Sequence, residues 1–461
     1  MHDGSDLMTR KPNLSSEREA LLRDRLRGEV RSRAIPKRLD EVPAPLSYGQ
    51  ERLWFLHQLE PRSPAYNRPL GLRLIGEIDI KAIESSLNKI VMRHESLRSS
   101  VGMENGVPVL RIANDLKIQI PMRDLVEVPV DMREREARRI ASEESRLPFD
   151  LSEGPLIRGT LIRLETEDHV LLLVIHHMVF DLWSANVLKS EFSSFYHAHI
   201  TGENSPLPEM EIQYSDFAHW QRRTYTDESL DRGIAYWSDQ LEKGSLFLQL
   251  PVDHPRTPIQ TYSGASKTRQ LSKNLTNGLI RLSREENSTL FMILFAAFNV
   301  LLLRYTGQQD NVVGVPTAGR THKETECLIG LFTNTLPFRM DLSGDPTVRE
   351  LIRRTRRMVL EGLAHQTIPF EKLVERLNPE RDLSRTPLFQ VLFNLENIPN
   401  AMSRAGILRI ETFRFDPGIA QYDLSMELQV AEERLDCDLV FNTELFEPDT
   451  AVRILDHFQN L

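Results

Sequence analysis

The spacing of apolar residues predicts strands and amphipathic helices in the first half of the chain. Residues 71–75 alternate between apolar and polar side chains, as in a half-buried strand, and residues 80–92 carry apolar side chains at helical spacing. A second strand is predicted over 156–163. Residues 170–175 form a continuous apolar run that indicates a buried strand, and a helix is predicted over 184–197.

The second half shows the same mixture of strands and helices. The apolar run 290–303 is shorter than the ~20 residues that span a bilayer, so we expect a buried core helix there and no membrane segment. The predicted elements are helices at 274–286, 289–305 and 348–364 and strands at 311–316, 388–395 and 424–430. Strands mixed with amphipathic helices in both halves predict an α/β protein with two similar layered lobes.

We expect the chain to fall into three parts. Residues 1–43 are predicted to be a linker, disordered at first and then helical, because Ser16 and Glu19 have the spacing of a capping box. Residues 44–222 would form an N-terminal lobe and residues 223–461 a C-terminal lobe. The Pro-rich stretch 241–261 lies near this division.

Composition excludes several classes of protein. The hydrophobic fraction of 40% over 461 residues is that of a globular protein rather than a disordered or fibrous one. A net charge of -9 argues against a general nucleic-acid binder. Cys327 and Cys437 are the only cysteines, which excludes a disulfide framework and favours a reducing compartment. Because the N-terminus lacks the apolar core of a signal peptide, we expect a cytoplasmic protein.

The residues best suited to chemistry follow the apolar strand 170–175. His176 and His177 come directly after it, and Asp181 follows four residues later. One histidine could act as a general base, since its pKa lies near working pH, and the aspartate could orient it. The alternative is a structural histidine pair at a strand end. The sequence lacks the zinc motif HExxH, the nucleophile motif GxSxG and a P-loop, so we expect no bound metal and no ATP chemistry.

Seven motifs resemble, in order, those of the condensation domains of nonribosomal peptide synthetases, in the chloramphenicol-acetyltransferase-like superfamily. They are SYGQERLW at 47–54, RHESLR at 93–98, HHMVFDLWS at 176–184, YSDFAHWQR at 214–222, IGLFTNT at 329–335, HQTIPFE at 365–371 and RDLSRTPLFQ at 381–390. The third is the family's active-site motif. Seven ordered matches over residues 44–461 are highly specific and favour the functional interpretation of the histidine pair.

The resemblance implies both a fold and a reaction. Two acetyltransferase-like lobes would form a V-shaped pseudo-dimer with a tunnel between them. Donor and acceptor carrier proteins would dock at its two mouths, each supplying a substrate on its own phosphopantetheine arm, and an adenylation domain is expected nearby. The acceptor amine would attack the donor thioester to form an amide. His177 would take the amine proton, or hold the amine and stabilise the tetrahedral intermediate.

The resemblance also assigns roles to residues around His177. Asp181 would pair with Arg93 in a structural ion pair, and His176 would brace the loop. Asn334 would hydrogen-bond a substrate carbonyl or cap a buried turn, two interpretations of equal weight. Two further residues of the motif, Trp183 and Ser184, would line the tunnel with Leu182.

Leu182 departs from the family pattern, which has glycine directly after the motif's aspartate. Leucine there predicts ordinary backbone angles and extra bulk on the donor side of the tunnel, so we hypothesise an atypical donor, such as an acyl or polyketide chain. The arginine-rich stretch 353–357 would be a solvated helix face or a docking patch for an acidic carrier. Two other functions stay open, a CoA- or carrier-dependent acyltransferase acting on a free acceptor and a non-catalytic recruitment domain.

Overall fold

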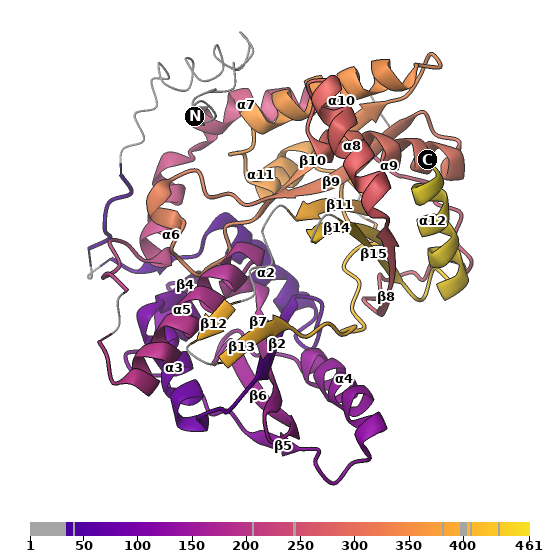
Figure 1. The fold of residues 1–461 in the computed structure, drawn as a ribbon. Helices are drawn as coiled ribbons and strands as arrows, with labels where there is room; N and C mark the ends of the chain where they lie inside the picture. The colour runs from indigo at the N-terminus through magenta and orange to yellow at the C-terminus, as the bar shows by residue number, and fades with distance from the viewer. Residues whose placement is uncertain are drawn as a thin grey trace, which may run out of the picture.

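A computed structural model describes most of the chain as two lobes, one above the other in Figure 1. The described residues are 34–39, 42–204, 207–242, 246–379, 382–396, 403–405, 408–431 and 434–461. The linker predicted over 1–43, with its disordered start and short helix, lies almost entirely outside them. Each lobe contains helices packed on a six-stranded sheet, which confirms the predicted α/β class with two layered lobes.

The sheet of the first lobe has the strand order β12-β13-β2-β7-β6-β5. Figure 1 shows helices α3 and α5 to one side of this sheet and α4 to the other. The strands are β2 (Asn67–Ile75), β5 (Met122–Asp124), β6 (Ile157–Glu165), β7 (Asp168–His176), β12 (Ser403–Ala405) and β13 (Leu408–Thr412). The helices are α3 (Ile80–Arg93), α4 (Val130–Arg146) and α5 (Leu182–Thr201). A small sheet of β1 (Ala44–Pro45), β4 (Val107–Ile112) and β3 (Ser99–Glu104) adjoins it.

The sheet of the second lobe has the order β10-β9-β11-β14-β15-β8. Its strands are β8 (Gly264–Leu271), β9 (Asp310–Thr317), β10 (Asn334–Asp341), β11 (Val391–Glu396), β14 (Leu424–Ala431) and β15 (Arg434–Asn442). Helices α8 (Lys273–Glu285), α9 (Leu290–Thr306), α10 (Val348–Ala364) and α12 (Pro448–Asn460) pack around it, with α9 buried as predicted. Helices α2 (Tyr48–Leu59), α6 (Tyr214–Thr224), α7 (Asp227–Leu241) and α11 (Phe370–Leu377) complete the fold.

The lobes exchange segments. Strand β13 leaves the second lobe and pairs antiparallel with β2 of the first. The side chains of Leu328 and Phe332 are buried in the core of the first lobe, although they lie in the second half of the sequence. Helix α6 runs across residue 222, after which the division between the lobes was predicted. The boundary at this residue therefore stays a prediction.

Most predicted elements of the core occur within a few residues of their expected bounds. The strand predicted from residue 388 starts late, because β11 begins only at Val391. Leu388 has a φ of 68°, in the left-handed region, so the chain turns there before it can enter the sheet. Of the helices described, none alone is long and apolar enough to cross a membrane. α8 and α9 reach that length only together, with a bend of 106°.

Candidate active site between the lobes

The histidine pair lies at the end of the buried strand β7. His176 is the last residue of the strand and pairs in register with Asn67, the first residue of β2. His177 begins a short 3-10 turn, and its backbone N–H donates to the carbonyl of Tyr66 at 2.7 Å. The start of β2 therefore holds the turn that carries His177.

The ring of His177 has a defined tautomer. Its Nδ1 lies 2.7 Å from the carbonyl oxygen of Phe180. Because a carbonyl only accepts hydrogen bonds, Nδ1 carries the hydrogen and Nε2 keeps its lone pair. The ring also stacks on Tyr66, with 6.5 Å between centroids and 11° between planes. This arrangement presents Nε2 as a hydrogen-bond acceptor for an incoming N–H group.

The surroundings of His177 favour the neutral ring. Burial lowers the pKa of His177 well below its usual value, and the positive charge of Arg68 lowers it further. A lowered pKa means that the ring stays unprotonated until the pH falls well below the usual histidine range. Nε2 is therefore available as an acceptor throughout the physiological range.

We expect the ring of His177 to show no titration near pH 6.5. Histidine-labelled protein would be followed by NMR from pH 8 to about 5.5, and His177→Ala would identify the signal. The Nε2 shift should stay at its neutral position across this range, because burial disfavours the charged form. A midpoint near 6.5 would contradict the described environment.

His176 is set to support the turn rather than to react. It is buried, and its Nδ1 accepts from the backbone N–H of Met178 at 3.2 Å. Its ring meets the edge of Phe149 with 6.0 Å between centroids. Burial lowers the pKa of His176 to about 3, so this ring is neutral at physiological pH. These contacts fit the bracing role predicted for it.

Asp181 pairs with Arg320, and the predicted pairing with Arg93 is wrong. Oδ1 of Asp181 lies 3.1 Å from the guanidinium of Arg320, and both side chains are almost fully buried, with exposed fractions of 0% and 1%. The same oxygen caps α5 by accepting from the backbone N–H of Ser184 at 2.8 Å. Oδ2 accepts from the backbone N–H of Phe332 at 3.0 Å. The carboxylate thus links the turn after His177 to a segment of the second half of the sequence.

Arg93 has another partner, Glu191, at 2.9 Å. Glu191 lies ten residues beyond Asp181 on α5, about 15 Å along the helix axis, which places Asp181 out of reach of Arg93. His94 contacts the second oxygen of Glu191 at 2.9 Å. The ion pair between Arg93 and Glu191 therefore joins α3 to α5 instead of supporting the turn after His177.

Asn334 caps a turn, as one of its two interpretations predicts. Its Nδ2 donates to the carbonyls of Gln366 and Ile368, at 2.9 and 2.7 Å. Its Oδ1 accepts from the backbone N–H of Phe370 at 3.0 Å. Since these bonds use both groups of the amide, Asn334 holds the loop that leads into α11.

The three residues after Asp181 have different surroundings. Leu182 is 46% exposed at the start of α5 and has ordinary helical backbone angles, as predicted. Trp183 donates from Nε1 to the carbonyl of Glu326 at 2.9 Å. Ser184 is fully buried and bonds to Asp181, so the prediction that it lines a tunnel is wrong.

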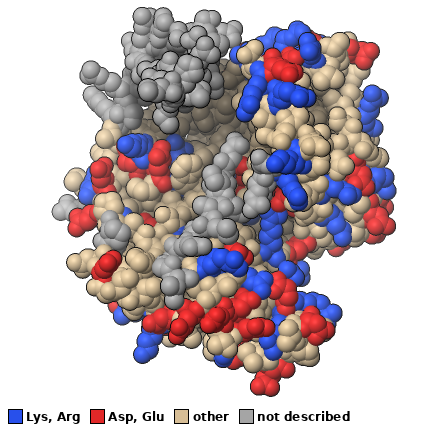
Figure 2. All heavy atoms as spheres, viewed as in Figure 1, with Lys and Arg blue, Asp and Glu red and all other residues tan. Residues whose placement is uncertain are grey.

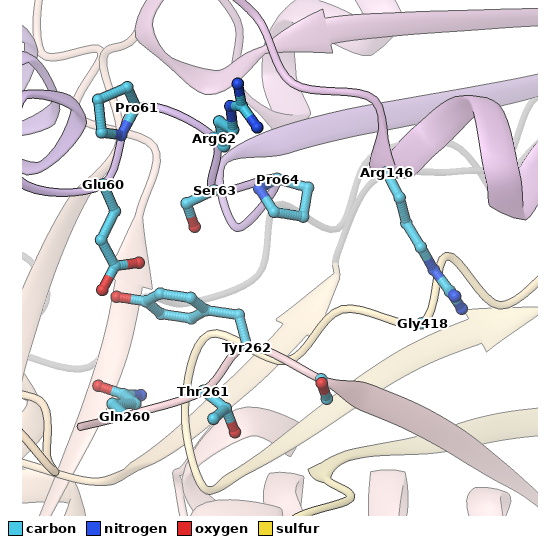
Figure 3. Close-up of a pocket in the computed structure, with 11 residues that line it drawn as sticks. Glu60, Pro61, Arg62, Ser63, Pro64, Arg146, Gln260, Thr261, Tyr262 and Gly418 are labelled. Atoms are coloured by element: carbon cyan, nitrogen blue, oxygen red, sulfur yellow. The ribbon is translucent and has the colours of Figure 1, made fainter. Parts of the chain in front are cut away.

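A cavity of about 740 Å³ lies between the lobes (Figure 3). Residues 60–64 and Arg146 line it from the first lobe, and residues 260–263 and Gly418 from the second. Glu60 and Tyr262 point toward one another across it. The cavity borders the loop between α2 and β2, the strand whose start holds His177. Within the described part of the chain, no group of three or more His, Cys, Asp or Glu side chains could hold a metal ion.

Three residues around His177 and Asp181 were not predicted from the sequence: Arg320, Tyr66 and Arg68. Arg320 is separated from Asp181 by 139 residues and lies outside the seven motifs. Tyr66 immediately precedes β2 and Arg68 is the second residue of that strand, and the local pattern gave no sign of nearby chemistry. Their nearness to His177 follows only from the pairing of β2 with β7.

Comparison with known proteins places residues 41–461 in the family described as Condensation domain. The chain is 46% identical over 424 residues to one of the linear gramicidin synthase subunits of Brevibacillus parabrevis, covering 91% of this chain and 8% of that protein. It is 38% identical over 455 residues to phosphinothricin tripeptide synthetase PhsC of Streptomyces viridochromogenes, covering 97% of this chain and 42% of that protein.

Solved structures share the fold. The SgcC5 protein of Streptomyces globisporus matches with a TM-score of 0.77 and 27% identity, over 90% of this chain and 97% of that one. The X-domain from teicoplanin biosynthesis matches with a TM-score of 0.80 and 24% identity, over 93% of this chain and 96% of that one. The second likeness concerns the fold alone.

Proposed function

Because the chain belongs to the condensation-domain family of nonribosomal peptide synthetases, we propose that it forms an amide between a carrier-bound acyl or peptidyl donor and a carrier-bound aminoacyl acceptor. The observation that carries the proposal is the fixed tautomer of His177, whose Nε2 lone pair is held ready for an amine N–H. The chain spans less than a tenth of the length of the gramicidin synthase relatives, so carriers and an adenylation domain as partners are part of this proposal.

The reaction needs little beyond alignment and one proton acceptor. The amine nitrogen attacks the thioester carbon, the tetrahedral intermediate expels the donor thiolate, and the amine loses a proton. A ring with a lowered pKa holds a proton only briefly. His177 therefore orients the amine through Nε2. It accepts the amine's proton there and passes that proton to the departing thiolate. Tethering both substrates between the lobes supplies the rest of the rate acceleration, because it raises their effective concentration.

The surface beside the cavity suits a carrier protein. Phe55 and Leu59 lie one turn apart on α2 and are 60% and 61% exposed. Ile259 and Leu383 are also exposed and adjoin Gln260, which lines the cavity. We infer that this apolar rim, formed by these four residues, receives the acceptor carrier. Phosphopantetheine would then enter the cavity from the carrier.

The basic residues of α10 are less suited to docking a carrier protein than the apolar rim is. Figure 2 shows Lys and Arg gathered on the second lobe, toward the end where Figure 1 places α8 and α10. Arg353 and Arg354 both pair with Glu350, at 2.7 and 3.3 Å. Because this carboxylate offsets part of their charge, a solvated face explains residues 353–357 better than a docking patch does.

Leu59→Ser is expected to weaken acceptor use without lowering the maximal rate. Loss of one apolar anchor should raise the half-saturating concentration of acceptor carrier by about fivefold to tenfold. Single-turnover rates at graded carrier concentrations would measure this change. Val107→Ser is the control, since Val107 is 59% exposed but lies in the small sheet of the first lobe. Equal effects of the two substitutions would contradict the docking surface.

A comparison of donors tests the class of reaction. The same acyl group would be offered on a carrier protein and on coenzyme A, and the same acceptor on a carrier and as a free amine. The proposal predicts that the carrier–carrier pair reacts at least about tenfold faster than the others, because docking raises the local concentration of both substrates. Preference for acyl-CoA with a free acceptor would instead indicate a CoA-dependent acyltransferase. The same panel of donors would test whether Leu182 favours an acyl or polyketide chain.

A further inference from the structure

The short segment 65–68 holds His177 in place from two directions. The carbonyl of Tyr66 accepts a hydrogen bond from the backbone N–H of His177, and the ring of Tyr66 stacks on the imidazole of His177. The next residue, Asn67, donates from Nδ2 to the carbonyls of Ser145 and Leu147, at 2.7 and 2.8 Å. These two bonds attach one side of segment 65–68 to residues 145–147 of the first lobe.

The other side of the segment is attached to the second lobe by one glutamine. Oε1 of Gln421 accepts from the guanidinium of Arg68 at 2.9 Å. Nε2 of Gln421 donates to the carbonyl of Ala65 at 2.8 Å. The amide therefore bonds on both sides of Tyr66, the residue that contacts His177.

Gln421 is itself anchored in the second lobe. Its carbonyl accepts from Nε2 of Gln260 at 2.9 Å. Two residues later, Asp423 is buried, pairs with the guanidinium of Arg256 and donates its backbone N–H to the carbonyl of Gln390 at 3.0 Å. The position of the Gln421 amide is thus set by the second lobe, while both of its partners belong to the first.

We propose that Gln421 is a positioning residue, which fixes segment 65–68 from the second lobe and so places the ring of His177 for reaction. The proposal rests on the proposed function of His177. The amide serves both partners at once, because its oxygen accepts from the guanidinium of Arg68 and its nitrogen donates to the carbonyl of Ala65. Misplacement of a catalytic group by a fraction of an ångström is enough to slow an aligned reaction.

The test compares Gln421→Ala with two other variants. Gln421→Glu keeps an acceptor for Arg68 and loses the donor for Ala65. Ser142→Ala is the matched control, because the hydroxyl of Ser142 also joins the first lobe to the segment between β13 and β14 that carries Gln421, but at the carbonyl of Asp416 and without a contact to segment 65–68. Thermal melting would confirm that all three variants fold. Single-turnover transfer would be measured at saturating carriers and across carrier concentrations.

A second readout does not depend on transfer. Diethyl pyrocarbonate acylates unprotonated imidazole nitrogens, and peptide mass spectrometry would report its rate at His177 in each variant. We expect Gln421→Ala to lower the maximal transfer rate about tenfold with little change in half-saturation, and to change the modification rate about threefold, while Ser142→Ala leaves both unchanged. Gln421→Glu should fall between wild type and Gln421→Ala.

Three results would overturn the proposal. These are equal effects of Gln421→Ala and Ser142→Ala on transfer, an unchanged modification rate at His177 in Gln421→Ala, and full activity of Gln421→Glu, since that variant lacks the bond next to Tyr66. Absence of transfer by the wild type would count against the proposed function instead. The modification rates would still decide whether Gln421 positions His177.

Discussion

Asp181→Ala is expected to lower the free energy of unfolding by about 3–5 kcal/mol, because it leaves the charge of Arg320 buried without a partner. The substitution also removes the N-cap of α5 and the acceptor for the backbone N–H of Phe332. The loss should therefore be felt both in the turn after His177 and in the segment around Phe332, which packs in the core of the first lobe. Transfer activity should fall with it, because the turn after His177 runs directly into the cap.

Urea unfolding of the purified variants would measure this loss. Glu143→Ala is the control, since Glu143 pairs with Arg139 on the surface of α4, where both side chains are more than half exposed and solvent screens the pair. Asp181→Leu combined with Arg320→Met removes both buried charges and should recover part of the stability lost in Asp181→Ala. Equal stabilities of Asp181→Ala and Glu143→Ala would contradict the structural role of this ion pair.

His177→Ala is expected to lower the single-turnover transfer rate by about 100-fold or more while the protein stays folded. The ring makes one hydrogen bond, to the carbonyl of Phe180, and is only partly buried, so its loss leaves the core intact. What disappears is the acceptor that orients the amine and carries its proton. Residual transfer would come from the alignment of the two tethered substrates.

Intact-protein mass spectrometry at timed intervals would measure the rates, and circular dichroism would establish the fold. His254→Ala is the control, because His254 pairs with Glu447 in a half-exposed position, away from the active-site turn. Equal rates for wild type and His177→Ala would mean that alignment alone carries the reaction. If His177→Ala lost both transfer activity and thermal stability, the result would point to a structural role for His177.

The local part of the site could be predicted from the sequence. A continuous apolar run predicted the buried strand β7, and the polar residues after it had to lie at its end. Asp181 had to follow in the same turn, and the ordered motifs indicated the family, whereas the role of Asp181 as the N-cap of α5 came only from the structure. These features depend on neighbours in the chain, which local patterns describe well.

The partners across the fold could not be predicted in the same way. Arg320 reaches Asp181 from a loop of the second half, whereas Arg93 had only the order of the motifs in its favour. Gln421 lies 353 residues from Arg68 and 356 from Ala65, and a half-exposed glutamine has no periodicity to mark it. The contacts of Gln421 depend on how the segment between β13 and β14 passes from one lobe to the other.

We propose above all that the chain transfers an acyl group from one carrier to the amine held by another. The most direct test mixes the protein with a loaded donor carrier and a loaded acceptor carrier and weighs both carriers by intact-protein mass spectrometry. We expect that the acceptor gains the donor's acyl group in place of one hydrogen and that the donor returns to its free-thiol mass. Release of the acyl group as a free acid, or two unchanged carriers that nonetheless bind the protein, would contradict it.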